Sequence, residues 1–202
     1  MSTADNRASF AIVRSGRRLE YITIVWNSLE GLIAIGAGLL AGSIALVGFG
    51  FDSVIEVSSG AIILWRLVSG EHRERLAQRL VGISFLALAV YVTFDSAKSL
   101  IYRELPEASY IGIAIAALSL VVMPLLARAK RDVASQLNSR AMHADSRQTD
   151  LCAYLSAILL GGLILNAVFG WWWADSVAAL IMVPIITNEG IEALRGEPCD
   201  CH

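Results

Sequence analysis

Two carboxylates stand four residues apart inside a long apolar stretch of the sequence. Asp52 and Glu56 fall near the middle of the segment 44–67. Four residues advance a helix by about one turn, roughly 6 Å, so both side chains share one helix face. Two buried anions at this separation repel each other unless a proton or a cation relieves the conflict. No Lys or Arg falls near the middle of any apolar segment, so the spacing favours a divalent cation site or a proton pathway over structural ion pairing.

A second polar set stands where the later apolar segment 149–170 begins. Asp145, Gln148 and Cys152 are spaced by three and four residues, so they share one stripe of a helix, whereas Asp150 points elsewhere. Asp145 is a candidate for a pathway or gating residue. A carboxamide oxygen and a thiolate are both competent metal ligands, and a thiolate favours borderline or soft ions such as zinc. A lone buried Cys is more often a small apolar filler. The residues alone therefore leave the role of Cys152 open.

Other polar residues in apolar segments have two interpretations each. Thr23, Asn27 and Glu30 follow one face of the segment 19–41, where they either line a pathway or hydrogen-bond between helices. Asp95 and Asp175 lie near the outer ends of their segments. They are either solvated by headgroup water or part of a vestibule.

The last residues of the chain include a small metal-binding pattern. Cys199, Cys201 and His202 form a Cys-x-Cys-His cluster that is able to capture zinc or copper, although short tails with two thiols are often simply solvated. We expect His72 and His143 to be surface residues rather than ligands. No disulfide framework is expected in a reducing compartment.

The elements that position these residues are membrane-spanning helices. The chain is 56% apolar and 17% charged, with a mean hydropathy of +0.61, which is too apolar for an ordinary soluble domain. Stretches of about 20 apolar residues cross a bilayer as helices. We predict an all-α bundle of six spans in a domain over 19–195, between a tail over 1–18 and a Cys/His tail over 196–202. The spans are 19–41, 44–67, 78–99, 109–127, 149–170 and 172–194. We expect a polar connection over 127–148, with an extension of the fifth helix as the alternative.

The basic residues indicate how the spans are oriented. Fourteen of the 16 Lys and Arg fall on one side of the predicted spans, and only Lys98 and Arg103 fall on the other. The positive-inside rule places both termini in the cytoplasm. We expect a multi-pass protein of a bacterial-type plasma membrane that contacts lipid and has no nucleic-acid partner.

Three stretches of the sequence resemble the cation diffusion facilitators. The run 41–56, AGSIALVGFGFDSVIE, is similar to their second span, whose hallmark is a metal-binding Asp-x-x-x-Asp. The run 173–180, WADSVAAL, is similar to the start of their sixth span, and the run 138–146, NSRAMHADS, to the entry of their fifth. Span number and orientation agree as well, so the resemblance covers nearly the whole chain.

The resemblance implies a cation, usually zinc, held between the second and fifth spans and exchanged for protons. Asp52 and Glu56 match the two carboxylates of the second span, while Gln148 and Cys152 stand at the His and Asp positions of the fifth. Gln148 cannot take up a proton, but Cys152 could supply the coupling, since metal binding deprotonates a thiol. Simple counting puts Gln148 and Cys152 nearer the cytoplasm than Asp52, so a long or tilted helix must close the gap. The family's cytoplasmic C-terminal domain is not seen after the sixth span, so a homodimer would rest on membrane contacts.

Three functions follow as hypotheses. The first is a transporter, not an enzyme, that exports a divalent cation such as zinc by alternating access and cation/proton antiport, without a prosthetic group. The second is a membrane metal sensor that binds the ion without moving it. The third is an intramembrane aspartyl hydrolase using Asp52 and Asp175, which requires two carboxylates that share a proton.

Overall fold

Six long helices make up the described part of the chain. The computed structural model describes residues 3–69, 74–137 and 139–195. Each helix contains a stretch long and apolar enough to cross a membrane, so the predicted all-α bundle of six spans is confirmed. The helices are α1 (Thr3–Ala41), α2 (Ile44–Ser69), α3 (Glu74–Tyr102), α4 (Tyr110–Leu137), α5 (Arg140–Phe169) and α6 (Trp173–Arg195).

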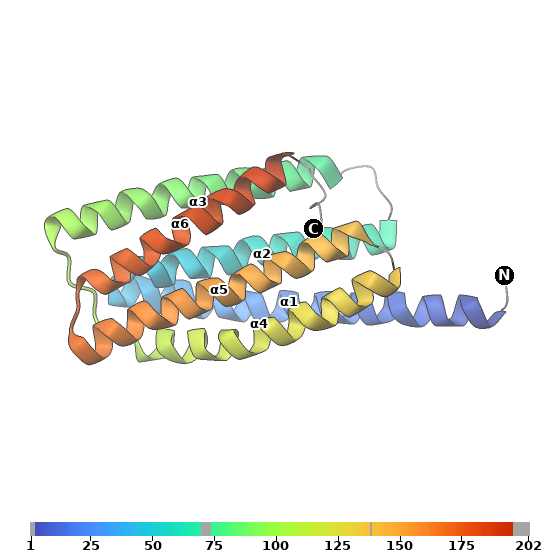
Figure 1. The fold of residues 1–202 in the computed structure, drawn as a ribbon, viewed down its shortest axis with the longest axis horizontal. Helices are drawn as coiled ribbons and strands as arrows, with labels where there is room; N and C mark the ends of the chain where they lie inside the picture. The colour runs from blue at the N-terminus through green and yellow to red at the C-terminus, as the bar shows by residue number, and fades with distance from the viewer. Residues whose placement is uncertain (1–2, 70–73, 138, 196–202) are drawn as a thin grey trace.

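The helices run side by side along the long axis of the molecule (Figure 1). α1, α2, α4 and α5 form one group, and α3 and α6 pair with each other along one side of it (Figure 1). The most extensive contacts join α1 to α2, α4 to α5 and α3 to α6. α1 begins and α6 ends at the same end of the bundle (Figure 1). Which side of the membrane this end faces stays a prediction.

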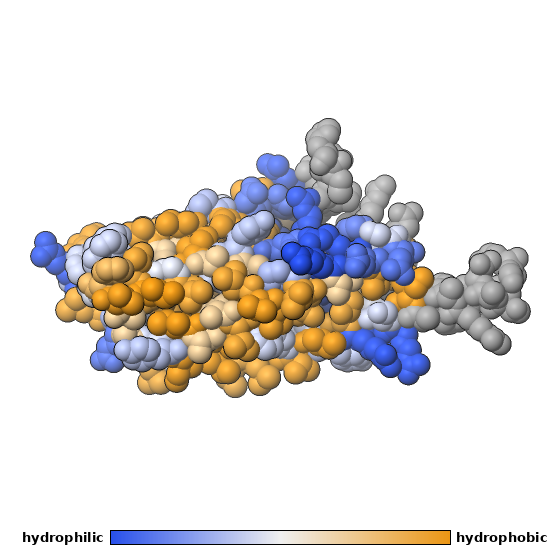
Figure 2. All heavy atoms as spheres, turned by 60° about the horizontal axis from the view of Figure 1, so that its bottom comes forward, coloured by the Kyte–Doolittle hydropathy of each residue, from blue (hydrophilic) through white to orange (hydrophobic). Residues whose placement is uncertain are grey.

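The surface of the bundle is mainly apolar. Figure 2 shows apolar side chains over most of its length, with hydrophilic residues gathered near the end where α1 begins and at the opposite tip. Large apolar side chains on the outside include Leu32, Val90 and Phe94, which are 73%, 70% and 71% exposed. A face of this kind is suited to lipid.

Two tight turns at one end of the bundle have clear local causes. Gly42 adopts a left-handed conformation (φ 66°), and the Ser43 N–H donates to the Gly38 carbonyl at 2.9 Å, which ends α1 in a Schellman motif. Ser43 then caps α2, since its hydroxyl accepts from the Leu46 N–H at 3.1 Å. Gly170 (φ 64°) ends α5 in the same conformation. Tight turns therefore join α1 to α2 and α5 to α6.

The connection between α4 and α5 differs from the prediction. α4 continues to Leu137 and α5 already begins at Arg140, where Ser139 caps it by accepting from the Met142 N–H at 3.4 Å. The polar connection over 127–148 is therefore wrong, and the helical alternative holds for both helices rather than for the fifth alone. Residues 127–137 and 140–148 contain no Gly or Pro, so nothing local breaks either helix. α1 likewise runs through residues 3–18, the predicted tail.

Small residues allow the helices to approach closely. A Cβ atom at Gly50 of α2 would lie 2.9 Å from the Ile35 backbone nitrogen of α1. A Cβ atom at Gly162 of α5 would lie 2.6 Å from the Ala178 Cβ of α6. Helix packing in membranes depends on such close contacts because lipid supplies little hydrophobic drive between helices. These contacts hold α2 closely against α1 and α5 closely against α6.

Candidate cation site

Asp52 and Glu56 face the interior of the bundle, as their spacing predicts. The two residues are 5% and 1% exposed, whereas Phe51 and Val54 on the other face of α2 are 42% and 46% exposed. The pair therefore shares a buried face in the middle of α2. Asp52 is also in electrostatic range of Glu189 on α6, a residue that our sequence analysis did not select.

The thiol of Cys152 lies beside both carboxylates. Cys152 is 1% exposed, and its thiol is near enough to Asp52 and Glu56 to interact with them electrostatically. For Cys152, this removes the difference in depth expected from counting residues along the two helices. Gln148 is 9% exposed, and its Nε2 has no hydrogen-bond partner in the described part of the chain.

These side chains adjoin without forming a finished metal site. In residues 3–69, 74–137 and 139–195, no three His, Cys, Asp or Glu side chains are arranged so that they could hold a metal ion. Asp52, Glu56 and Cys152 supply hard and soft donors from two helices. In the described structure, these three side chains do not converge on one ion position.

The expectation that no basic residue approaches Asp52 and Glu56 is wrong, because Lys130 lies near Glu56. The lysine was assigned to a polar connection, but α4 carries it into the bundle, where it is fully buried. Its Nζ donates to Asp145 Oδ2 at 2.5 Å and lies 3.5 Å from Glu20 Oε2. It also donates to the Thr149 hydroxyl at 3.2 Å. Asp145 is thus an ion-pair partner, and its possible pathway role stays a prediction.

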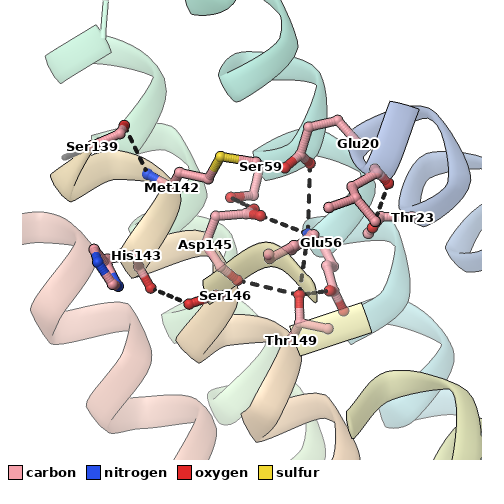
Figure 3. Close-up of polar contacts among 12 residues, drawn as sticks. Glu20, Thr23, Glu56, Ser59, Ser139, Met142, His143, Asp145, Ser146 and Thr149 are labelled. Carbon is pink, nitrogen blue, oxygen red and sulfur yellow. Dashed lines mark hydrogen bonds and ion pairs between the residues drawn. The ribbon is translucent and has the colours of Figure 1, made fainter. Parts of the chain in front are cut away.

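Thr149 joins this ion-pair cluster to Glu56. The Thr149 hydroxyl donates to Glu56 Oε1 at 2.7 Å, while Glu56 Oε2 is buried and has no hydrogen-bond partner among the described residues. Figure 3 shows Glu20, Glu56, Asp145 and Thr149 pointing toward a common centre from α1, α2 and α5. The hydrogen bond from Thr149 therefore offsets the repulsion between Asp52 and Glu56 only on the Glu56 side. Asp52 keeps acidic neighbours, Glu56, Glu189 and Glu30.

The polar stripe of α1 is buried and longer than predicted. Glu20, Thr23, Asn27 and Glu30 are each 0% exposed. Glu30 Oε2 accepts from Ser53 Oγ at 3.1 Å, so this residue does hydrogen-bond between helices. Its Oε1 and both amide atoms of Asn27 are unpartnered in the described chain. Glu20 was not selected from the sequence, although it extends the same spacing of three and four residues.

Asp175 is a helix cap rather than a solvated or vestibule residue. It is 1% exposed, and its carboxylate accepts from Ser43 Oγ at 2.5 Å, Ile44 N at 2.8 Å and Ala45 N at 3.3 Å. It thus ties the start of α6 to the start of α2. Asp52 lies eight residues further along α2, roughly 12 Å. The two aspartates cannot share a proton, which removes the geometry that the hydrolase hypothesis requires.

The remaining candidates stand apart from this cluster. Asp95 of α3 is partly exposed and accepts from the Tyr91 hydroxyl one turn earlier at 3.4 Å. His143 is partly exposed at the start of α5. The tail residues Cys199, Cys201 and His202, like His72, lie outside the described residues.

Buried acids inside a helical membrane bundle are typical of membrane transport proteins, and comparison with known proteins specifies the kind. The cation efflux transmembrane domain family matches residues 21–195. The chain therefore belongs to this family, which confirms the resemblance to the cation diffusion facilitators.

Named relatives agree with this assignment. The chain is 30% identical over 179 residues to an uncharacterised transporter of Methanocaldococcus jannaschii, covering 83% of this chain and 63% of that protein. It is 26% identical over 182 residues to transmembrane protein 163 of Xenopus laevis, covering 87% of this chain and 65% of that protein. The chain thus spans somewhat less than two-thirds of the length of these relatives.

Proposed function

We propose that this chain is a secondary transporter for a divalent metal cation, bound between α2 and α5. The family supports cation transport, and two relatives carry the word transporter in their names. One observation carries the location of the site. Asp52, Glu56 and the Cys152 thiol are buried in the bundle and interact with one another electrostatically.

The donor set favours zinc among divalent ions. Two carboxylates, one thiolate and the amide oxygen of Gln148 would complete the four-coordinate shell that zinc prefers. The thiolate selects against magnesium and calcium, which take oxygen ligands. Binding requires that the thiol and the acids be deprotonated, so the ion displaces protons. Cation/proton antiport follows from this exchange and does not require a histidine.

The transport cycle rests on convergence and separation of α2 and α5. Loading brings the donors together, and release moves them apart toward the other side of the membrane, as alternating access requires. Cytoplasmic termini, a plasma-membrane location and a homodimer remain our predictions. A metal sensor without flux is the competing function, and it would use the same donors.

The decisive experiment measures ion movement directly. The full chain is reconstituted in vesicles that contain a zinc-sensitive dye, and initial zinc uptake is followed with and without a proton gradient. Asp52→Asn removes the ligand charge at nearly constant volume, so we expect uptake to fall at least about tenfold, to the level of empty vesicles. The matched control is Asp95→Asn, the same change in a carboxylate of α3 outside the cluster, which should keep wild-type uptake.

Two outcomes would reject the transporter. Undiminished uptake by Asp52→Asn excludes the proposed site. Tight zinc binding by the wild-type chain without uptake selects the sensor instead. Competition by manganese, cobalt and cadmium in the same assay identifies the preferred ion.

A further inference from the structure

The two oxygens of the Glu56 carboxylate have different surroundings. Oε1 accepts a hydrogen bond of 2.7 Å from the Thr149 hydroxyl. Oε2 is buried and has no such partner in the described residues. Since Glu56 is 1% exposed, bulk water does not supply the missing partner. Oε2 is thus the oxygen of this carboxylate that carries no hydrogen bond in the described structure.

Lys130 fixes the orientation of the Thr149 hydroxyl. A hydroxyl has one proton to donate, and the Glu56 oxygen at 2.7 Å is nearer than the Asp145 carbonyl at 3.2 Å. The same oxygen accepts from Lys130 Nζ at 3.2 Å. An ammonium can only donate, so it orients the hydroxyl proton away from itself and toward Glu56.

Lys130 is itself immobilised by two acids from different helices. Asp145 of α5 lies 2.5 Å from its Nζ and Glu20 of α1 lies 3.5 Å away, with all three side chains buried. Ser59 of α2 adds a hydrogen bond of 3.4 Å to Asp145 Oδ1. The series of hydrogen bonds from Lys130 through Thr149 to Glu56 is therefore anchored on four helices.

We propose that Thr149 is a specificity-determining positioning residue, anchored by Lys130, that makes Glu56 a monodentate ligand. The hydroxyl occupies Oε1, so that Oε2 alone is presented to the ion. This inference rests on the proposed function, because it takes Glu56 to be a cation ligand. One oxygen per carboxylate suits the four-coordinate shell of zinc, whereas manganese favours a larger shell of oxygen ligands. Thr149 thus favours zinc over manganese.

The test uses an isosteric pair of substitutions at this position. Thr149→Val keeps the shape of the side chain and removes the hydroxyl, whereas Thr149→Ser keeps the hydroxyl. Thr93→Val is the matched control, because the Thr93 hydroxyl only donates to the Ala89 carbonyl of its own helix, at 2.7 Å. The full chain in vesicles is assayed for initial zinc and manganese uptake over a range of concentrations.

Thr149→Val should raise the half-saturating zinc concentration about tenfold, as expected for loss of a hydrogen bond to a charged group. Manganese should be affected less, because the freed Oε1 becomes a second ligand atom. The preference for zinc over manganese therefore falls, while the maximal zinc rate stays within about threefold of wild type. Thr149→Ser and Thr93→Val should match wild type in both ions. A purely structural role for Thr149 would not change the ratio between two ions.

Four results would overturn the inference. They are an unchanged ion preference in Thr149→Val, equal impairment of Thr149→Ser, a loss of all uptake at saturating zinc in Thr149→Val, or the same change in Thr93→Val. The proposed function survives each of these if wild type transports and Asp52→Asn does not. If wild type moves neither ion, the proposed function fails and this inference fails with it.

Discussion

Asp175 and Glu56 are both buried acids of the bundle, yet their surroundings are opposite. The Asp175 carboxylate accepts three hydrogen bonds, from Ser43, Ile44 and Ala45. Glu56 has one oxygen engaged by Thr149 and the other without a partner in the described chain. The first arrangement engages both oxygens of the carboxylate and joins α6 to α2. The second leaves one carboxylate oxygen without a hydrogen bond, which suits the reversible binding of an ion.

The same contrast separates two regions of the bundle. Around the start of α2 the polar atoms of Asp175 and Ser43 are matched. Along the acidic centre, Glu30 Oε1 and both amide atoms of Asn27 are buried without partners in the described residues. Unpaired buried polar atoms are costly and uncommon, so each one marks a place where water, an ion or a functional role is expected.

The largest expected effect comes from removing Lys130, the cation that is buried beside this centre. Lys130→Met leaves Asp145 and Glu20 without the ammonium that neutralises them, which should lower the free energy of unfolding by about 3–5 kcal/mol. Unfolding of the detergent-solubilised chain, followed by denaturant titration, measures this. Lys98→Met is the control, because Lys98 pairs with Glu104 at the surface, where both side chains are about half exposed. Equal behaviour of the two variants would show that the cluster is not buried as described.

A smaller effect on stability is expected for Asp175, whose two carboxylate oxygens both accept hydrogen bonds. Asp175→Ala removes the acceptor for the Ser43 hydroxyl and for two backbone N–H groups of α2, and should cost about 2–3 kcal/mol of stability. Zinc affinity of the folded protein should not change, since the aspartate stands away from the cation donors. Asp52→Asn should behave in the opposite way, losing zinc while keeping its stability, because it removes an unpaired buried charge. The two regions would not be distinct if both variants lost both properties.

The smallest effect tests packing without changing any polar group. Gly162→Ala would place a methyl group 2.6 Å from the Ala178 Cβ, so α5 and α6 must separate slightly, at a cost of about 1–2 kcal/mol. Gly161→Ala is the matched control on the next residue, where an added Cβ meets nothing within 4 Å. Thermal unfolding in detergent should be lowered only for the first. Equal melting of both variants would mean that the contact between α5 and α6 is looser than described.

The inward face of Asp52 and Glu56 was predictable because it depends on local periodicity. Four-residue spacing in an apolar helix places two side chains on one face whatever surrounds the helix. The stripe of Thr23, Asn27 and Glu30 followed for the same reason, and the same rule would have added Glu20. Resemblance aligned Cys152 with the site, and the structure places its thiol beside the carboxylates.

The cluster around Lys130 was not predictable in the same way. Charged residues in 127–148 suggested a solvated connection, because a charge in isolation favours water. What buries Lys130 is a set of partners on other helices, Glu20, Asp145 and Thr149. No local pattern encodes the meeting of residues that far apart in the chain. The bonding of Asp175 to the start of α2 was missed for the same reason.

Apolar stretch length and helical periodicity, both local properties, were enough to determine the six helices and the inward face of the two acids. Only the tertiary structure decided which buried acids are saturated and which keep an oxygen free. That outcome depends on hydrogen-bond geometry between helices, where a shift of about an ångström makes or breaks a bond. The difference between the cap at Asp175 and the open oxygen of Glu56 arises at that level.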